Sequence, residues 1–242
     1  MSDPNYLAFD LMFKNYKRKG TLYPGWKAVH LKNQSNASYY YGEYDERTNK
    51  RRGVGIMLFH CGDRYEGEWD DNLFHGKGTY IDKNGSRYEG KWIRGKKDGE
   101  GVLTYLNGER FEGKYENGEK ESGLYTKPNG EYYKGKFKNN KFEGRGTFHF
   151  VNGDVYEGEW EKGEINGYGK KTFANGDVYE GEWKNGEKHG KGKYTSVDGF
   201  KYEGDYVNGK RSGVGVLINT KNGESKRGIW EYGNFVQWIE NY

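Results

Sequence analysis

The sequence has almost none of the residues on which disulfide-bonded, cysteine-metal or membrane-spanning proteins depend. Its 242 residues include one cysteine, Cys61, so no disulfide can form within the chain and no cysteine cluster can bind a metal. No apolar run approaches the ~20 residues that a membrane-spanning helix needs. Residues 1–13 are briefly apolar, but Asp3 and Asp10 stand where a secretory signal carries basic residues. We therefore expect a cytoplasmic protein without a cleaved signal.

Proline and net charge are also scarce. The chain has 3 prolines, and its 40 Lys and Arg residues nearly balance 36 Asp and Glu residues, which leaves a net charge of +4. This balance gives no general argument for binding nucleic acid or anionic lipid. What is abundant is glycine, with 40 residues, and aromatic area, with 23 Tyr, 12 Phe and 7 Trp. Disordered chains lack such aromatic area, so a folded protein is expected.

A tandem repeat organises both the glycines and the aromatics. The element Tyr-x-Gly-x-aromatic recurs every 22–25 residues, and its leading aromatic residue is taken here as position 0 of each repeat. Eight repeats begin at Tyr40, Tyr65, Tyr88, Phe111, Tyr133, Tyr156, Tyr179 and Tyr202. Glycine returns at positions 2, 11, 13 and 20. The fourth repeat lacks one residue near Ser122-Gly123, where a local distortion is expected.

Within each repeat the pattern predicts one β-hairpin. Asn-Gly or Asp-Gly pairs such as Asn84-Gly85 and Asn175-Gly176 end the repeats and predict two-residue hairpin turns, with a weaker set of turns at mid-repeat. In Tyr156–Trp160 the Tyr, Gly and Trp share one face while the two glutamates point to the other, which is strand alternation. No helical period is present. The predicted fold is all-β, an elongated single-layer antiparallel β-meander in which rings of adjacent strands stack above glycines.

Three regions follow from the repeat boundaries. Residues 1–39 form an N-terminal extension, expected to cap the first repeat's edge or to dock on a partner, although its basic-hydrophobic stretch could also touch an anionic membrane. Residues 40–225 hold the eight repeats. Residues 226–242 form a partial repeat, which keeps Gly228 and Trp230, and a C-terminal cap.

The element Tyr-Glu-Gly-Glu-Trp followed by Gly-Lys-Gly-Thr or its variants resembles the membrane occupation and recognition nexus (MORN) repeat. The resemblance covers roughly Tyr40 to Phe235. It implies a β-meander used in scaffolding, membrane apposition and cytoskeletal assemblies, including radial spokes and other axonemal structures. A small stand-alone member of the axonemal kind is therefore expected, located at the cytoskeleton, in a cilium or flagellum.

Seven aromatic residues at position 4 are the candidate partner-binding residues. Two readings stay open for each of them: contact with a partner, or packing against the chain's own sheet. They are Trp69, Trp92, Tyr115, Phe137, Trp160, Trp183 and Tyr206.

Several chemical motifs have simpler structural explanations. Three stretches read Gly-x-x-x-x-Gly-Lys, for example Gly85 to Lys91, but an aromatic residue follows where a phosphate-binding loop needs Ser or Thr. His75 and His189 lie in different repeats, and Cys61 falls at a predicted turn, so neither a metal site nor a nucleophile is expected. Glutamates at position 1 are interpreted as a solvated face. No catalytic residues, metal, cofactor, nucleic acid or small-molecule substrate are expected.

The function predicted from the sequence is a non-enzymatic scaffold or adaptor that binds other proteins of a larger assembly through its aromatic face and its N-terminal extension. An alternative is a peripheral membrane adaptor that binds anionic phospholipids through basic turns such as Lys96-Lys97 and residues 188–193. A third possibility, an accessory subunit that tunes an enzyme, would leave no trace in the sequence.

Overall fold

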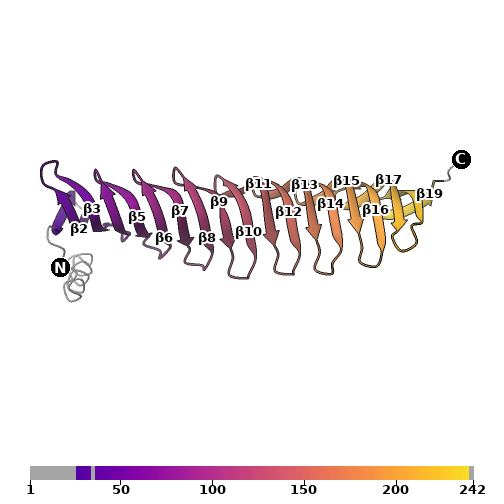
Figure 1. The fold of residues 1–242 in the computed structure, drawn as a ribbon, viewed down its shortest axis with the longest axis horizontal. Helices are drawn as coiled ribbons and strands as arrows, with labels where there is room; N and C mark the ends of the chain where they lie inside the picture. Colours follow the sequence, from indigo (N-terminus) through magenta and orange to yellow (C-terminus); the bar gives the residue numbers. More distant parts are fainter. Residues whose placement is uncertain (1–25, 34–35, 240–242) are drawn as a thin grey trace. The chain divides into compact units, whose positions relative to one another are not determined.

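The computed structural model describes residues 26–33 and 36–239, and these contain strands and turns but no helix. They divide into two compact units, one ending at Lys120 and the other beginning at Glu121. In the first unit each strand pairs antiparallel with the next, in chain order from β1 to β8 (Figure 1). The strands are β1 (Trp26–Asn33), β2 (Asn36–Asp45), β3 (Lys50–Leu58), β4 (Arg64–Asp70), β5 (Leu73–Ile81), β6 (Arg87–Ile93), β7 (Lys96–Thr104) and β8 (Arg110–Glu116).

The second unit repeats this plan from β9 to β19, again with every neighbouring pair antiparallel. The predicted all-β antiparallel meander is thus confirmed. The strands are β9 (Glu119–Thr126), β10 (Tyr132–Lys138), β11 (Lys141–His149), β12 (Val155–Glu161), β13 (Glu164–Thr172), β14 (Val178–Lys184), β15 (Glu187–Thr195), β16 (Phe200–Val207), β17 (Lys210–Asn219), β18 (Ser225–Glu231) and β19 (Asn234–Trp238).

Glycines lie opposite glycines in each strand pair from β2 to β8 and from β9 to β18. In the first unit Gly67 pairs with Gly55 on one side and with Gly78 on the other, and Gly78 pairs in turn with Gly90. In the second unit the same row runs from Gly123 to Gly228. This row leaves a strip of bare backbone across each sheet, on which aromatic rings can lie.

The two-residue turns are not at the repeat ends, where they were predicted. The two-residue turns occur at mid-repeat, where both central residues have positive φ, as in Arg94 (48°) and Gly95 (81°). At the repeat ends Gly85 has positive φ but Asn84 does not, and the Gly85 N–H donates to the Asp82 carbonyl at 2.9 Å. This is a three-residue loop with a left-handed glycine at its end. The prediction of two-residue turns at the repeat ends was wrong, because these loops require positive φ only at the glycine.

A β-bulge follows position 2 in the hairpins, a feature the sequence analysis did not anticipate. In β4 and β5 the register shifts between Gly67 and Glu68, and Gly76 opposite has a φ of 54°. The Glu68 carboxylate accepts a hydrogen bond from the Lys77 N–H at 2.9 Å and thereby closes the bulge. Glu159 and Glu182 accept the equivalent bonds in later repeats. Bulges of this kind bend the strand and increase its local twist.

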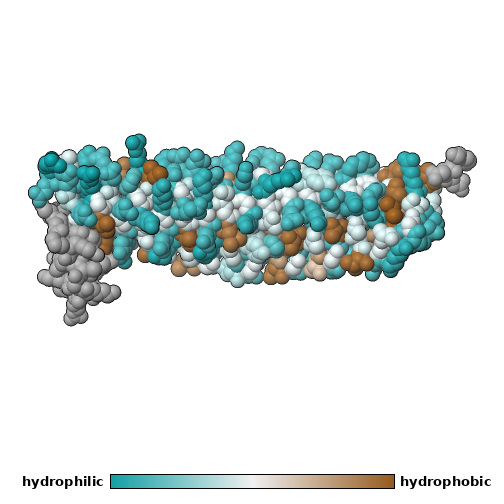
Figure 2. All heavy atoms as spheres, in the orientation of Figure 1, coloured by the Kyte–Doolittle hydropathy of each residue, from teal (hydrophilic) through white to brown (hydrophobic). Residues whose placement is uncertain are grey.

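The core of each sheet consists mainly of aromatic side chains from one face. The position 0 rings are fully buried or nearly so, and polar or charged side chains occupy the other face. Figure 2 shows that hydrophilic residues cover most of the surface in view, with apolar residues between them. Rings packed across strands therefore replace the second layer that would cover a sheet in a globular domain.

Strand β1 lies in the predicted N-terminal extension. In the N-terminal extension, strand β1 pairs with β2 over its whole length, from Trp26 opposite Glu43 to Asn33 opposite Asn36, and so covers that edge. Residues 1–25 and 34–35, on which the rest of the predicted extension falls, lie outside the described residues.

The division between the two units falls within the fourth repeat, where the missing residue had predicted a distortion.

Candidate functional site

The aromatic face of each unit is built on the ring at position 0. Tyr65 lies directly over the Gly67–Gly78 pair, and its hydroxyl donates a hydrogen bond to the Glu68 carbonyl at 2.8 Å. A Cβ added at Gly78 would come within 2.3 Å of the Tyr65 hydroxyl. Burial disfavours the charged phenolate, which raises the pKa of Tyr133, the equivalent residue in the fifth repeat, to about 12. The predicted packing of rings on glycine is confirmed.

The position 4 aromatics, predicted as partner-binding residues, are buried beside these rings. All seven are between 2% and 8% exposed. Trp160 is an example: its Nε1 donates to the Gly146 carbonyl at 3.2 Å, and its ring meets Tyr133 and Tyr156 edge-on at 5.3 and 5.4 Å. The seven side chains are Trp69, Trp92, Tyr115, Phe137, Trp160, Trp183 and Tyr206.

Packing against their own sheet therefore accounts for all seven side chains, as the alternative in the sequence analysis had it. The four tryptophans, Tyr115 and Tyr206 each join one repeat to the one before it, because each contacts the position 0 ring of both. Contact of these residues with a partner stays a prediction. The rim of the aromatic face is formed by other residues, most of them half-buried, which sequence reasoning missed.

These residues are at position 9 of the repeats. Its side chain covers the outer face of the position 0 ring, and it is filled in two chemically different ways. Phe74 stacks on Tyr65 with the ring centroids 3.8 Å apart and 13° between the planes, and Phe142 does the same on Tyr133 at 3.9 Å. In other repeats a cation takes the same place, with Lys97 at 4.7 Å from the Tyr88 ring and Arg211 at 4.7 Å from the Tyr202 ring.

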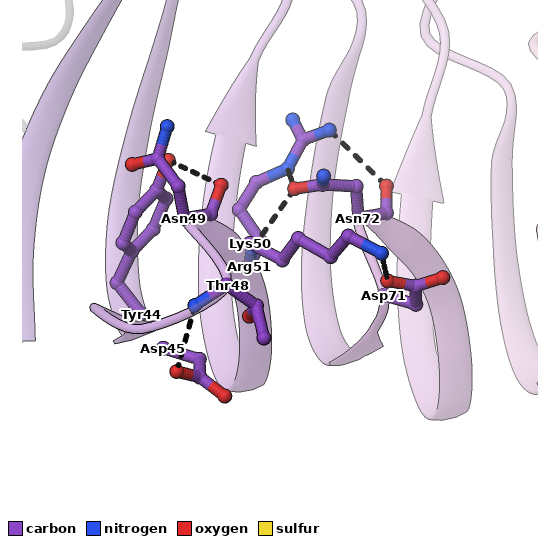
Figure 3. A network of polar contacts seen from close by, with 8 residues as sticks. All are labelled: Tyr44, Asp45, Thr48, Asn49, Lys50, Arg51, Asp71 and Asn72. Atoms are coloured by element: carbon purple, nitrogen blue, oxygen red, sulfur yellow. Dashed lines mark hydrogen bonds and ion pairs between the residues drawn. The ribbon is translucent and has the colours of Figure 1, made fainter.

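The first repeat shows how such a cation is held. Arg51 lies 4.6 Å from the Trp69 ring, and three of its groups contact the next hairpin turn (Figure 3). Its backbone N–H and Nε donate to the Asn72 side-chain oxygen at 2.9 and 3.2 Å, and a terminal nitrogen donates to the Asn72 carbonyl at 3.1 Å. Lys50 forms an ion pair with Asp71 of the same turn. Cation–π contact and hydrogen bonds together fix this guanidinium.

A carboxylate two residues before position 0 supports the loops at the repeat ends. Asp177 accepts hydrogen bonds from the Tyr194 hydroxyl, from the Val197 N–H at 3.0 Å and from the Asn175 side-chain nitrogen at 2.9 Å. These donors stabilise the carboxylate and lower the pKa of Asp177 to about 2, with the Tyr194 hydroxyl as the largest cause. Asp154 has the equivalent place, where it pairs with Lys171 at 2.9 Å.

The opposite face is polar, and its charges are largely paired along single strands. Glu89 and Glu112 at position 1 each form an ion pair with the arginine two residues earlier, Arg87 at 2.7 Å and Arg110 at 2.6 Å. Glu66 and Glu203 have the same kind of partner, so four of the six carboxylates predicted as a solvated face form ion pairs on their own strands. Open grooves follow the glycine row on this face, lined in the second unit by Lys134, Gly135, Arg145, Gly146, Thr147, Glu157, Gly158, Tyr168, Gly169 and Lys170.

The basic turns that favoured a membrane alternative do not all point into solvent. Lys97 and Lys188 turn onto the aromatic face, where each contacts at least two rings. Lys191 forms an ion pair with Asp205 at 2.7 Å. Lys96 and Lys193 remain exposed. Each turn thus offers fewer free cations to a lipid surface than its sequence indicates.

The remaining motifs occupy ordinary structural places. Gly85, Gly108 and Gly130, which start the three phosphate-loop-like stretches, are loop glycines with positive φ. Cys61 is exposed at a turn, as predicted. Among residues 26–33 and 36–239 no group of three or more His, Cys, Asp or Glu side chains is placed to hold a metal ion. In the same ranges no helix is long and apolar enough to cross a bilayer.

Comparison with known proteins identifies the repeat. Six stretches, more than half of the chain, match the family model of the MORN repeat: residues 65–87, 88–110, 133–155, 156–178, 179–201 and 202–223. The repeats beginning at Tyr40 and Phe111 are the ones that depart from the common length. No curated protein matches the chain in sequence.

Among solved structures, two similarities are weak. The TCP domain of SAS-4 (dCPAP) of Drosophila melanogaster, in complex with a proline-rich motif of Ana2 (dSTIL), is 15% identical with a TM-score of 0.42, over 63% of this chain and 83% of that chain. A catalytically inactive virginiamycin B lyase from Staphylococcus aureus, with quinupristin, is 12% identical with a TM-score of 0.16, over 84% of this chain and 73% of that chain. Nothing about function follows from either score.

Proposed function

Because the chain belongs to the MORN repeat family, we propose that it is a non-enzymatic scaffold or adaptor that binds other proteins within a cytoskeletal assembly of a cilium or flagellum. The matched repeats support a binding or scaffold role. The ciliary or flagellar location rests on the resemblance of the repeats to those of axonemal proteins.

The single observation that carries the proposal is the repetition of one hairpin with constant contacts. The Trp160 and Trp183 side chains each donate to the carbonyl of the glycine 14 residues earlier, and Trp69 and Trp92 do the same. Equivalent groups therefore recur at every second strand within a unit, about 10 Å apart. Such a regular array suits extended partners that contact several repeats at once.

The rim of the aromatic face is the surface we assign to protein partners. Position 9 varies between Phe, Ile, Lys and Arg while the ring below it stays aromatic. A variable position above a constant ring changes the charge of the surface without changing the packing below. The proposal therefore predicts that partner choice depends on position 9 more than on position 4.

The test is to express the full tagged chain in cells that carry cilia or flagella. Its position is imaged, and its partners are identified by crosslinking and affinity capture after axonemes and membranes have been separated. The proposal expects stable protein partners in the axonemal fraction. Recovery only with membranes, and flotation of the purified chain with anionic liposomes that ~0.5 M salt abolishes, would replace it by the membrane adaptor.

A further inference from the structure

Lys188 on β15 has surroundings that differ from those of the other position 9 residues. Its ammonium lies within 6 Å of four ring centroids: Tyr194 at 4.6 Å, Tyr179 at 4.9 Å, Phe173 at 5.0 Å and Tyr206 at 5.9 Å. The side chain is half-buried. Because the side chain is only half-buried, part of it stays in contact with solvent and can meet a ligand.

No acidic side chain of the described residues neutralises this ammonium. An ammonium carries three donors, and among residues 26–33 and 36–239 the Lys188 ammonium has no hydrogen-bond or ion-pair partner, although the Lys188 carbonyl accepts from the Gly209 N–H at 2.9 Å. Asp177, the carboxylate with the strongest influence on Lys188, is already engaged by Tyr194, Val197 and Asn175. The cation therefore has capacity for an acceptor that the chain itself does not supply.

A second cation lies beside it. Arg211, at position 9 of the next repeat, covers the Tyr202 ring at 4.7 Å and lies opposite Tyr206 in the β16–β17 strand pair. Tyr206 is also one of the four rings around Lys188. Asp205 cannot compensate this pair fully, because it forms an ion pair with Lys191 at 2.7 Å. Two cations in consecutive repeats raise the positive potential of this part of the face, which attracts a partner that carries more than one carboxylate.

We propose that Lys188 and Arg211 form a carboxylate-binding site on the aromatic face of the second unit, and that its occupant is an acidic segment of a partner protein. The site rests on the proposed function and specifies the chemistry of the partner. Burial and the neighbouring charges of Arg211 and Lys171 lower the pKa of Lys188 to about 8, with burial the largest cause. A bound carboxylate offsets each of these effects, because it favours the charged amine.

The spacing of the two cations indicates the form of the segment. They occupy the same position in consecutive repeats, two strands and hence about 10 Å apart. A single carboxylate is too small to contact both at that distance. In a polyproline II segment, residues three apart lie on the same side at about 9.3 Å, so acidic residues at every third position would meet successive repeats. Such a segment is also pre-ordered and presents a flat apolar surface to the rings.

The probe follows from this spacing: a capped peptide of five Glu-Pro-Pro triplets, with five Gln-Pro-Pro triplets as the uncharged control. Binding to the full chain is measured by calorimetry at low salt. The decisive variant is Lys188→Phe, since Phe74 and Phe142 fill the same position in two other repeats and show that the fold accepts it. Lys188→Gln is the second variant, should the first lower the melting temperature. Lys193→Ala removes an equal charge from the opposite face of β15 and is the matched control.

We expect the Glu peptide to bind and the Gln peptide not to bind. Lys188→Phe and Lys188→Gln should each weaken binding at least tenfold, while Lys193→Ala should change it less than twofold. In an NMR titration of the Lys188 side chain, the Glu peptide should raise its pKa from about 8 towards the ordinary value of 10.5. Equal binding of the two peptides, or of wild type and both Lys188 variants, would overturn the site. If those variants still captured the wild-type partners from cells, the scaffold function would stand without it.

Discussion

Replacing Gly78 by alanine tests whether the glycine row exists to seat the rings. The added Cβ would lie 2.3 Å from the Tyr65 hydroxyl and 2.6 Å from two ring carbons, closer than real contacts allow. Gly78 has no positive φ, so the substitution adds a steric conflict and no backbone strain.

Two responses to this conflict can be compared. If Tyr65 leaves its place, the chain loses burial worth about 1.5–3 kcal/mol, a hydrogen bond worth about 1 kcal/mol and ring contacts worth about 1 kcal/mol. If the surroundings yield instead, overpacking costs about 1–3 kcal/mol. The fold takes the cheaper response, so Gly78→Ala should lower the free energy of unfolding by about 2–3 kcal/mol.

The assay is urea unfolding followed by tryptophan fluorescence, since Trp69 and Trp92 both meet Tyr65 edge-on. Gly130→Ala is the matched control: its added Cβ has no neighbour within 4 Å, but its φ is 89°. That control should cost only about 1–2 kcal/mol of backbone strain. A Gly78→Ala loss no larger than the control's would refute the steric role of the glycine row.

Three further changes test other contacts. Trp160→Ala should cost about 3–5 kcal/mol because the ring is buried, and unchanged melting with loss of partners would instead indicate a contact role. The low pKa of Asp177 means that its contribution to the free energy of unfolding is present above about pH 4 and is lost as the pH falls towards 2. Asp177→Asn should therefore reduce the loss of stability between pH 4 and pH 2. An equal loss in the variant and the wild type would contradict this. Tyr133 has a raised pKa, so its contribution to the free energy of unfolding is present below pH 10 and is lost as the pH rises through 12. Tyr133→Phe should therefore lose less folded structure at alkaline pH, as measured by circular dichroism.

Much of the fold follows from period alone. Alternation in Tyr156–Trp160 fixes which residues share a face, and glycine at position 2 predicts a ring lying on the backbone. These are local consequences of strand geometry, so they can be derived without knowing the neighbours. The turns could not be derived in the same way. Arg94 and Lys162 adopt φ values of 48° and 53° in two-residue turns, which neither residue prefers.

The candidate site depended on information that a single repeat does not contain. Position 4 had two interpretations from the sequence, because a single-layer sheet leaves one face open, and the structure shows Trp160 covered by rings from its own repeat and the preceding one. Position 9 escaped notice because Phe142 and Lys188 have opposite chemistry, although both use the same ring face. Aligning the repeats by strand register, in place of residue type, would have revealed that position.

The first repeat shows how freely the outer turns can change. Its turn from Glu46 to Asn49 is two residues longer than the turns at the same place in other repeats, yet Gly42 still faces Gly55 across the hairpin. The extra length is absorbed entirely outside the paired strands. A short epitope or fluorophore inserted between Arg47 and Thr48 would therefore report on the intact protein in living cells, with both faces left as they are.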